Sequence, residues 1–255
     1  MAQDRQHEQF RKRENTREQL FQNIWDQDLD NVFADVASYY DRANQVASLG
    51  LWTWMQSSFV ATIKLQSQQK ILDVCAGTNA IGIALLQREP NLEVYAFDRS
   101  LPMQVEGRRV AKTQGLEIEN VNGDAHHLPF ADNQFDVVTL QYASRHLRVM
   151  EAFAEIKRVL KPGGHFYHSD MLRPDNCLLE FMYRNYLRAS LNVTAFVFDS
   201  SPAAQRCKEY FVRTLHMFYT ADELSQLLGD LGYQNIGNQA LLGGMVGFHR
   251  AVKAV

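Results

Sequence analysis

Between residues 70 and 169 the sequence alternates between short apolar runs and longer segments with helical periodicity, and this alternation limits the chain to few folds. The apolar runs span residues 70–75, 93–97, 119–122, 135–140 and 165–169, and helical segments span 80–88, 102–114 and about 149–160. Lys161-Pro-Gly-Gly164 is interpreted as a turn. Strands that alternate with helices predict a mostly parallel sheet with helices on both faces.

Helical patterns flank this α/β core. Residues 4–31 are typical of a polar helix, residues 32–66 of two or three more, and residues 172–218 of an aromatic-rich helical insertion. Thr220 and Glu223 have the spacing of a capping box, and closing strands are predicted at 233–237 and 242–252. We therefore expect an N-terminal helical cap at 1–66 and a main domain at 67–255, with a helical lid at about 172–218.

Composition narrows the function. The 255 residues have a formal net charge of -3, which gives no global field for nucleic acid. Three scattered cysteines show neither a disulfide framework nor paired metal-ligand spacing. The first 31 residues lack the apolar segment of a signal peptide, and no apolar run reaches the roughly 18 residues that cross a bilayer. We expect a cytoplasmic protein, with membrane contact of a peripheral kind only.

The turn after the first strand indicates a nucleoside-type ligand. In Asp73-Val-Cys-Ala-Gly-Thr-Asn79, Gly77 lets the backbone approach a ligand closely and Thr78 offers a hydroxyl. Asp98 ends the second strand, where a carboxylate can accept both ribose hydroxyls. A dinucleotide fingerprint would need three glycines, and only Gly77 and Gly82 are present. A turn without any ligand is the remaining alternative.

A second signal follows the third strand. Asp124 and Ala125 can offer a carboxylate and a backbone amide to an adenine edge, while the alternative is a plain surface turn. The adjacent His126 and His127 have no partner ligand at a recognisable spacing, so no metal is expected there.

These blocks together resemble the ubiquinone/menaquinone biosynthesis C-methyltransferase (UbiE-type) family, from about residue 32 to 253. The similar segments include Val32-Phe-Ala-Asp-Val-Ala-Ser-Tyr-Tyr-Asp41, Ile71-Leu-Asp-Val-Cys-Ala-Gly-Thr78, Arg158-Val-Leu-Lys-Pro-Gly-Gly164 and Gly243-Gly-Met-Val-Gly-Phe-His-Arg250. The resemblance implies a Rossmann-like, seven-stranded class I methyltransferase sheet. It also implies S-adenosylmethionine (SAM) as cofactor and a quinol or related small aromatic as substrate.

The resemblance also assigns roles to residues. Together with the turn and strand-end residues above, the resemblance gives a set of expected cofactor contacts. They are Tyr40, Asp73, Ala76, Gly77, Thr78, Asn79, Asp98, Arg99, Met103, Asp124, Ala125 and Gln141. Substrate contacts are expected from Asn44, Tyr142 and Arg145. His146 stands where the family usually has Asn.

Two segments depart from the family pattern. Asn79 and Ala80 replace a glycine and an aspartate of the glycine-rich turn, although Asn adopts a left-handed backbone more readily than other non-glycine residues. Leu51-Trp-Thr-Trp54 replaces the usual His-Arg-x-Trp. These changes keep two alternatives open: an O- or N-methyltransferase of another small molecule, and a SAM-binding protein of this fold that does not transfer methyl.

The implied reaction needs a positioned acceptor and help for a phenol that loses its proton. Arg145 is predicted to stabilise the phenolate, and His146, or a water held between the two, to take the proton. The alternatives are an ion-paired arginine and a histidine that caps a turn.

The aromatic stretch at 178–198 has two interpretations. It is either a lid that receives an isoprenoid tail or touches the membrane, or a helix packed on the domain core. A homodimer stays open from the sequence.

Overall fold

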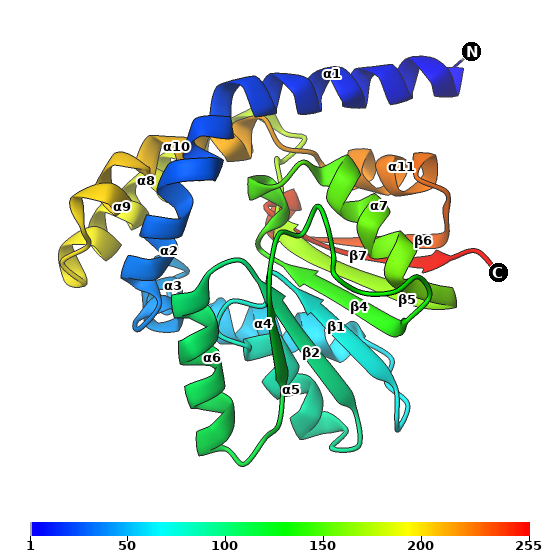
Figure 1. Cartoon of the computed structure of the whole chain (residues 1–255). Coiled ribbons are helices and arrows are strands. Elements are labelled where there is room, and N and C mark those ends of the chain that lie inside the picture. Colours follow the sequence, from blue (N-terminus) through cyan, green and yellow to red (C-terminus); the bar gives the residue numbers. More distant parts are fainter. Residues whose placement is uncertain (1) are drawn as a thin grey trace.

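The computed structural model describes residues 2–255, without the side chains of residues 2–5, 26 and 203. One sheet has the strand order β3-β2-β1-β4-β5-β7-β6 (Figure 1). The strands are β1 (Lys70–Val74), β2 (Glu93–Asp98), β3 (Glu119–Asn122), β4 (Phe135–Gln141), β5 (Leu160–Met171), β6 (Tyr233–Leu241) and β7 (Val246–Lys253). The first five run parallel, and β7 lies antiparallel between β5 and β6. This arrangement confirms the predicted seven-stranded Rossmann-like sheet.

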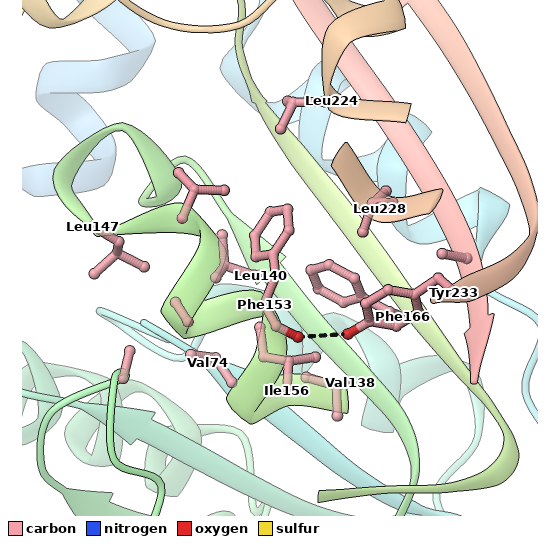
Figure 2. Packing of buried hydrophobic residues seen from close by; sticks show 14 of the residues in the cluster. Val74, Val138, Leu140, Leu147, Phe153, Ile156, Phe166, Leu224, Leu228 and Tyr233 are labelled. Atoms are coloured by element: carbon pink, nitrogen blue, oxygen red, sulfur yellow. Dashed lines mark hydrogen bonds between the residues drawn. The ribbon is translucent and has the colours of Figure 1, made fainter. Parts of the chain in front are cut away.

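Helices cover both faces of the sheet, and alternation along each strand determines which face a residue joins. Leu72, Val74 and Val138 face α7 (Val149–Val159) and α11 (Ala221–Asp230) in the larger core cluster (Figure 2). Ile71 and Val137 each precede one of these residues and point to the opposite face of the sheet. They pack with α4 (Trp52–Thr62) and α5 (Ala80–Arg88). The sheet is therefore buried on both sides, as its near-continuous apolar strands require.

Most of the remaining helices lie in two segments, one before β1 and one between β5 and β6. The N-terminal elements are α1 (Ala2–Asn23), a π-helical turn η1 (Ile24–Asp28), α2 (Leu29–Val36) and α3 (Tyr40–Ala47). The insertion contributes α8 (Cys177–Val197), α9 (Pro202–Arg206) and α10 (Lys208–His216), and these lie beside α2 and α3 in Figure 1. Helix α6 (Leu101–Thr113) packs at β2 and β3.

Three predicted boundaries are wrong. Strand β6 extends to Leu241 rather than ending at residue 237. Residues 161–164 are not a separate turn, because β5 is continuous and these four residues form a bulge between the pairs Phe135–Leu160 and Val137–His165. Strand β7 begins at Val246 rather than at residue 242, because a 3-10 turn, η3 (Leu242–Gly244), has left-handed backbone angles that end the strand pairing. The Thr220 capping box is confirmed.

Candidate active site

The turn between β1 and α5 has a left-handed backbone at three positions. Cys75, Gly77 and Asn79 have φ values of 56°, 53° and 62°, so the left-handed conformation expected for Asn79 is present. Its side chain donates to Asn120 Oδ1 at 3.0 Å and is fully buried. Asn79 therefore shapes the turn, and its side chain does not line the cleft described next.

A narrow cleft lies beside this turn. Its walls are Tyr40, Asp41, Trp52, Gln56, Asp73, Cys75, Ala76, Gly77, Thr78, Ala80, Ile81, Gln141 and Tyr142. The structure thus brings together seven of the residues predicted from the sequence: Tyr40, Asp73, Ala76, Gly77, Thr78, Gln141 and Tyr142. The enclosed part measures about 40 Å³, so a nucleoside-sized ligand must extend beyond it.

The polar groups of this cleft fit SAM. Within the described residues, Asp73 Oδ2 and Gln141 Nε2 are buried and have no hydrogen-bond partner. Asp73 Oδ1 accepts from Thr139 Oγ1 at 2.7 Å, and burial raises the pKa of Asp73 to about 7. A free carboxylate oxygen and a free amide N–H complement the amino and carboxylate groups of a methionine moiety.

Asp98 lies next to the cleft, at the end of β2. Its two carboxylate oxygens accept the backbone N–H groups of Gly77 and Ser100, both at 2.8 Å. Burial raises the pKa of Asp98. Met103 packs beneath the same turn, where its Cε would lie 3.2 Å from a Cβ added to Gly77.

Two other predicted cofactor residues have local partners in the structure, and a third is buried in the core. Arg99 bonds to the Trp25 carbonyl and to Asp30, and so ties β2 to the N-terminal helices. Asp124 is exposed and paired with His126 Nδ1 at 2.5 Å, whereas Ala125 is buried in the core. Asp124 and Ala125 lie outside the enclosed cleft, and their adenine contact stays a prediction.

Residues of α3 and α4 that sequence reasoning missed complete the walls of the cleft. Thr78 Oγ1 donates to Asp41 Oδ2 of α3 at 3.1 Å, and Trp52 Nε1 donates to Asp41 Oδ1 at 3.4 Å. Gln56 of α4 completes this wall. Asp41 stands within the quoted family segment, but only the fold shows that α3 lies over the turn.

A second, larger cavity of about 540 Å³ opens beside the cleft. Tyr40, Trp52 and Tyr142 line both spaces and form the wall between them. Apolar side chains make up most of the lining, and α2, α3 and α8 supply many of them. The predicted substrate residues Asn44, Tyr142 and Arg145 all contribute to the lining, as does His146. Asn44 Nδ2 is buried there without a partner among the described residues.

Arg145 is part of a buried chain of polar groups. Its Nε donates to Asp170 Oδ1 at 2.9 Å, and Ser144 Oγ donates to Asp170 Oδ2 at 2.5 Å. Ser144 Oγ also contacts His168 Nε2 at 2.8 Å, and His168 Nδ1 lies 3.3 Å from His249 Nδ1. Sequence reasoning missed Asp170, although an acidic residue close to the carboxyl end of a parallel strand was a usable signal.

The positions of the hydrogen atoms in this row of polar side chains follow from the groups at its two ends. His249 Nε2 lies 2.9 Å from the Ala221 carbonyl, which only accepts, so this nitrogen carries a hydrogen. Because Ser144 donates to Asp170, His168 Nε2 must donate to Ser144. Burial lowers the pKa of both imidazoles and so favours their neutral forms.

His146 has its orientation set by Tyr210 of α10. Trp25 Nε1 donates to the Tyr210 hydroxyl at 2.8 Å, and that hydroxyl lies 2.6 Å from His146 Nδ1. The indole can only donate, so the hydroxyl accepts from it and keeps its own hydrogen available for His146 Nδ1. Burial, together with the nearby guanidinium of Arg145, holds the pKa of His146 well below its usual range. With Nδ1 as the acceptor, the neutral ring carries its hydrogen on Nε2.

Comparisons with known proteins show the family to which the chain belongs. The sequence model of the ubiE/COQ5 methyltransferase family matches residues 21–253. A demethylmenaquinone methyltransferase of Renibacterium salmoninarum is 33% identical over 87% of this chain and 90% of its own length. The ubiquinone/menaquinone biosynthesis C-methyltransferase UbiE of Roseobacter denitrificans is 31% identical over 87% of this chain and 89% of its own length.

A solved structure supports the fold independently. A SAM-dependent methyltransferase from Aquifex aeolicus superposes with a TM-score of 0.56 at 18% identity, over 78% of this chain and 89% of that one. The family match covers most of the chain, and the cleft beside Asp73 suits the cofactor. The chain therefore belongs to the ubiE/COQ5 methyltransferase family and is a SAM-dependent methyltransferase.

Proposed function

We propose that this enzyme methylates a ring carbon of a quinol that carries a long apolar tail. The observation that carries the proposal is the mostly apolar 540 Å³ cavity, which shares one wall with the cofactor cleft and has Arg145 and His146 in its lining. A small polar acceptor would leave most of this space unfilled. The names of the relatives from R. salmoninarum and R. denitrificans, which refer to menaquinone and ubiquinone, support the same class of substrate.

Residues of the cleft would hold the cofactor. Asp73 and Gln141 supply the free carboxylate and amide, Gly77 the close backbone approach, and Asp98 the carboxylate for the ribose. Tyr40, Ala76, Thr78, Met103, Asp124 and Ala125 complete the proposed contacts, and Asn79 and Arg99 act through the turn and the cap. When bound, SAM supplies a methyl group on a sulfonium, so the acceptor needs only positioning and activation.

Arg145 activates the acceptor. Loss of the hydroxyl proton makes the adjacent ring carbon nucleophilic, and a guanidinium in a largely apolar cavity stabilises the resulting phenolate strongly. Asp170 fixes Nε of the guanidinium from beneath. Asn44, with its free amide N–H, and Tyr142 line the same cavity and hold the ring.

His146 supports the phenolate as a donor. Its Nδ1 accepts from Tyr210, so Nε2 already carries a hydrogen and does not take the substrate proton. This proposal refines the role expected from the sequence. A water between Arg145 and His146, the second acceptor considered there, receives the proton instead.

The cap at 1–66 and the lid at 172–218 admit the tail. Leu49, Leu51, Met182, Tyr186 and Leu242 line the cavity and are also exposed, so the mouth is ringed by apolar side chains. Met182 and Tyr186 belong to α8, whose outer face also exposes Phe181 and Phe196. A rim of this kind suits peripheral contact with a bilayer from which a tailed quinol enters. No described helix has the length and apolarity to cross a membrane.

Two measurements test the proposal. In a strain without this enzyme, the quinone profile should show a quinone that lacks one ring methyl group. The purified enzyme should transfer labelled methyl from SAM to the corresponding quinol, and calorimetry should show binding of SAM and its demethylated product. An unchanged quinone profile, together with labelling of a hydroxyl or amine in place of a ring carbon, would reject it.

A further inference from the structure

Helix α1 places a buried ion pair against the loop that carries Arg145 and His146. Glu14 and Arg17 lie one turn apart on α1 and bond to each other at 2.5 Å. The Arg17 side chain is fully buried and that of Glu14 is 9% exposed. Buried charges are costly unless they are paired and hydrogen-bonded, so such a pair needs partners. In Figure 1, α1 lies over α7 and α11.

Both members of the pair bond to the backbone of the loop. Arg17 Nη2 donates to the Arg145 carbonyl at 2.8 Å. Glu14 Oε2 accepts from the backbone N–H of Val149 at 2.5 Å. Val149 begins α7, whose N-cap residue makes no side-chain capping bond, so the carboxylate satisfies one of the free N–H groups at this helix start.

Neighbouring groups hold the pair in one geometry. The Tyr219 hydroxyl donates to Glu14 Oε1 at 2.8 Å. The Arg17 guanidinium lies over the rings of Phe218 and Trp25, at 5.2 and 5.7 Å from their centroids. Trp25 is also the residue that orients Tyr210 toward His146. One continuous N-terminal segment therefore contacts both proposed catalytic residues, Arg145 through its backbone and His146 through Tyr210.

We propose that Glu14 and Arg17 are positioning residues for methyl transfer, because they fix the loop from Arg145 to Val149 at both ends. The proposal rests on the function proposed above for Arg145. The family match begins at residue 21, so Glu14 and Arg17 lie outside the segment that this chain shares with the family model. This part of α1 thus contacts the active-site loop from outside the segment matched by the family model.

We call the contacts of Glu14 and Arg17 with the loop from Arg145 to Val149 the brace. The double variant Glu14→Gln/Arg17→Met tests it. The amide oxygen introduced at position 14 still accepts from Val149, and no buried charge is left alone, so the variant removes chiefly the bond to the Arg145 carbonyl. We expect kcat to fall ~10-fold or more, since small displacements of a catalytic group are costly, while the KM for SAM stays within about twofold. Hydrogen exchange of the peptide that covers residues 143–150 should become faster.

Two further variants serve as controls for this interpretation. Arg13→Met removes another α1 contact, the ion pair with Glu223 of α11, which does not touch the loop, and it should leave kcat and loop exchange near wild type. Arg17→Lys keeps the buried cation, but one ammonium replaces the fork that reaches both Glu14 and the Arg145 carbonyl, so an intermediate loss is expected.

The outcomes separate the brace from the proposed function. Equal kcat values in the Glu14→Gln/Arg17→Met and Arg13→Met variants, or unchanged loop exchange in the first, would overturn the brace. Full activity of an Arg145→Ala variant would instead overturn the role proposed for Arg145, and the exchange measurement would still decide whether Arg17 fixes the loop.

Discussion

Asp170 accepts a hydrogen bond from Nε of Arg145 at 2.9 Å, and the two side chains are 0% and 7% exposed. This pair holds a cation at the wall of an apolar cavity, where it acts on the substrate with little screening. A buried pair also means that removal of one partner affects both chemistry and stability.

Substitution of this pair separates its two roles. Arg145→Ala should abolish turnover while SAM still binds, and it should cost about 3–5 kcal/mol of stability because Asp170 is left unpaired. Arg145→Ala/Asp170→Ala should recover much of that stability but no turnover. Methyl-transfer rates, calorimetry with SAM and urea unfolding check this, and near-normal turnover in either variant would contradict it.

Gly77 should determine SAM affinity. Its φ of 53° and the Met103 Cε at 3.2 Å leave no relaxed place for a methyl group, so Gly77→Ala should weaken SAM binding and cost about 1 kcal/mol of stability. Gly115→Ala is the matched control, because Gly115 also has a positive φ, of 67°, but has open space around it. The two variants should lose similar amounts of stability, but only Gly77→Ala should bind SAM more weakly. Equal SAM affinities of the two variants in calorimetry would refute the role of Gly77 in SAM binding.

SAM affinity should depend on pH through Asp73. Burial raises the pKa of its carboxyl to about 7, so the group becomes neutral as the pH falls through 7 and no longer attracts a charged amino group. The Kd should therefore rise below pH 7, by up to about tenfold per pH unit. Asp73→Asn should bind SAM weakly and without this pH dependence, and the same steep profile in that variant would exclude Asp73 as the titrating group.

The His168–His249 pair should destabilise the protein in acid. Burial lowers both pKa values, so the unfolded chain binds more protons than the folded one below its histidine pKa near 6.5. The contribution of the two histidines to stability is fully present above this pH and is lost as the pH falls below it. Urea unfolding across pH 5–8 measures this, and His168→Gln should reduce the slope; an unchanged slope would assign the effect elsewhere.

The apolar rim should bind lipid. Met182→Glu places a charge at the cavity mouth, so it should reduce co-sedimentation with liposomes and raise the KM for a long-tailed quinol more than for a short-tailed one. Val105→Glu is the control, since Val105 is 57% exposed, compared with 59% for Met182, and lies on α6 outside the cavity lining. Equal behaviour of the two variants would favour a lid helix without membrane contact.

The sequence predicted what depends on local pattern. Short apolar runs between helical patterns placed the first five strands, and the capping residues at 220 and 223 placed α11. The turn at 161–164 was mispredicted because its Pro-Gly-Gly composition is typical of turns, whereas the pairs Phe135–Leu160 and Val137–His165 on either side of it keep the segment within β5 as a bulge.

The candidate site was predictable where residues lie at the end of a strand or match the family pattern. Asp73 and Gly77 were found in the first way, Tyr40 and Gln141 in the second, and all four line the cleft. Asp41, Ser144, His168 and His249 were missed because their roles come from contacts between distant segments, such as the 3.1 Å bond from Thr78 to Asp41. Arg17 was missed because a polar N-terminal helix gives no sign of a fully buried guanidinium.

The wall of Tyr40, Trp52 and Tyr142 belongs to two binding spaces at once. Thermodynamic reciprocity then applies: if one ligand shifts these rings and so changes the affinity for the second, the second changes the affinity for the first by the same factor. A mutation in the wall consequently changes both affinities together. During evolution, a change of substrate tail can be accommodated in α8 alone, whereas a change of the ring to be methylated has to be compatible with cofactor binding.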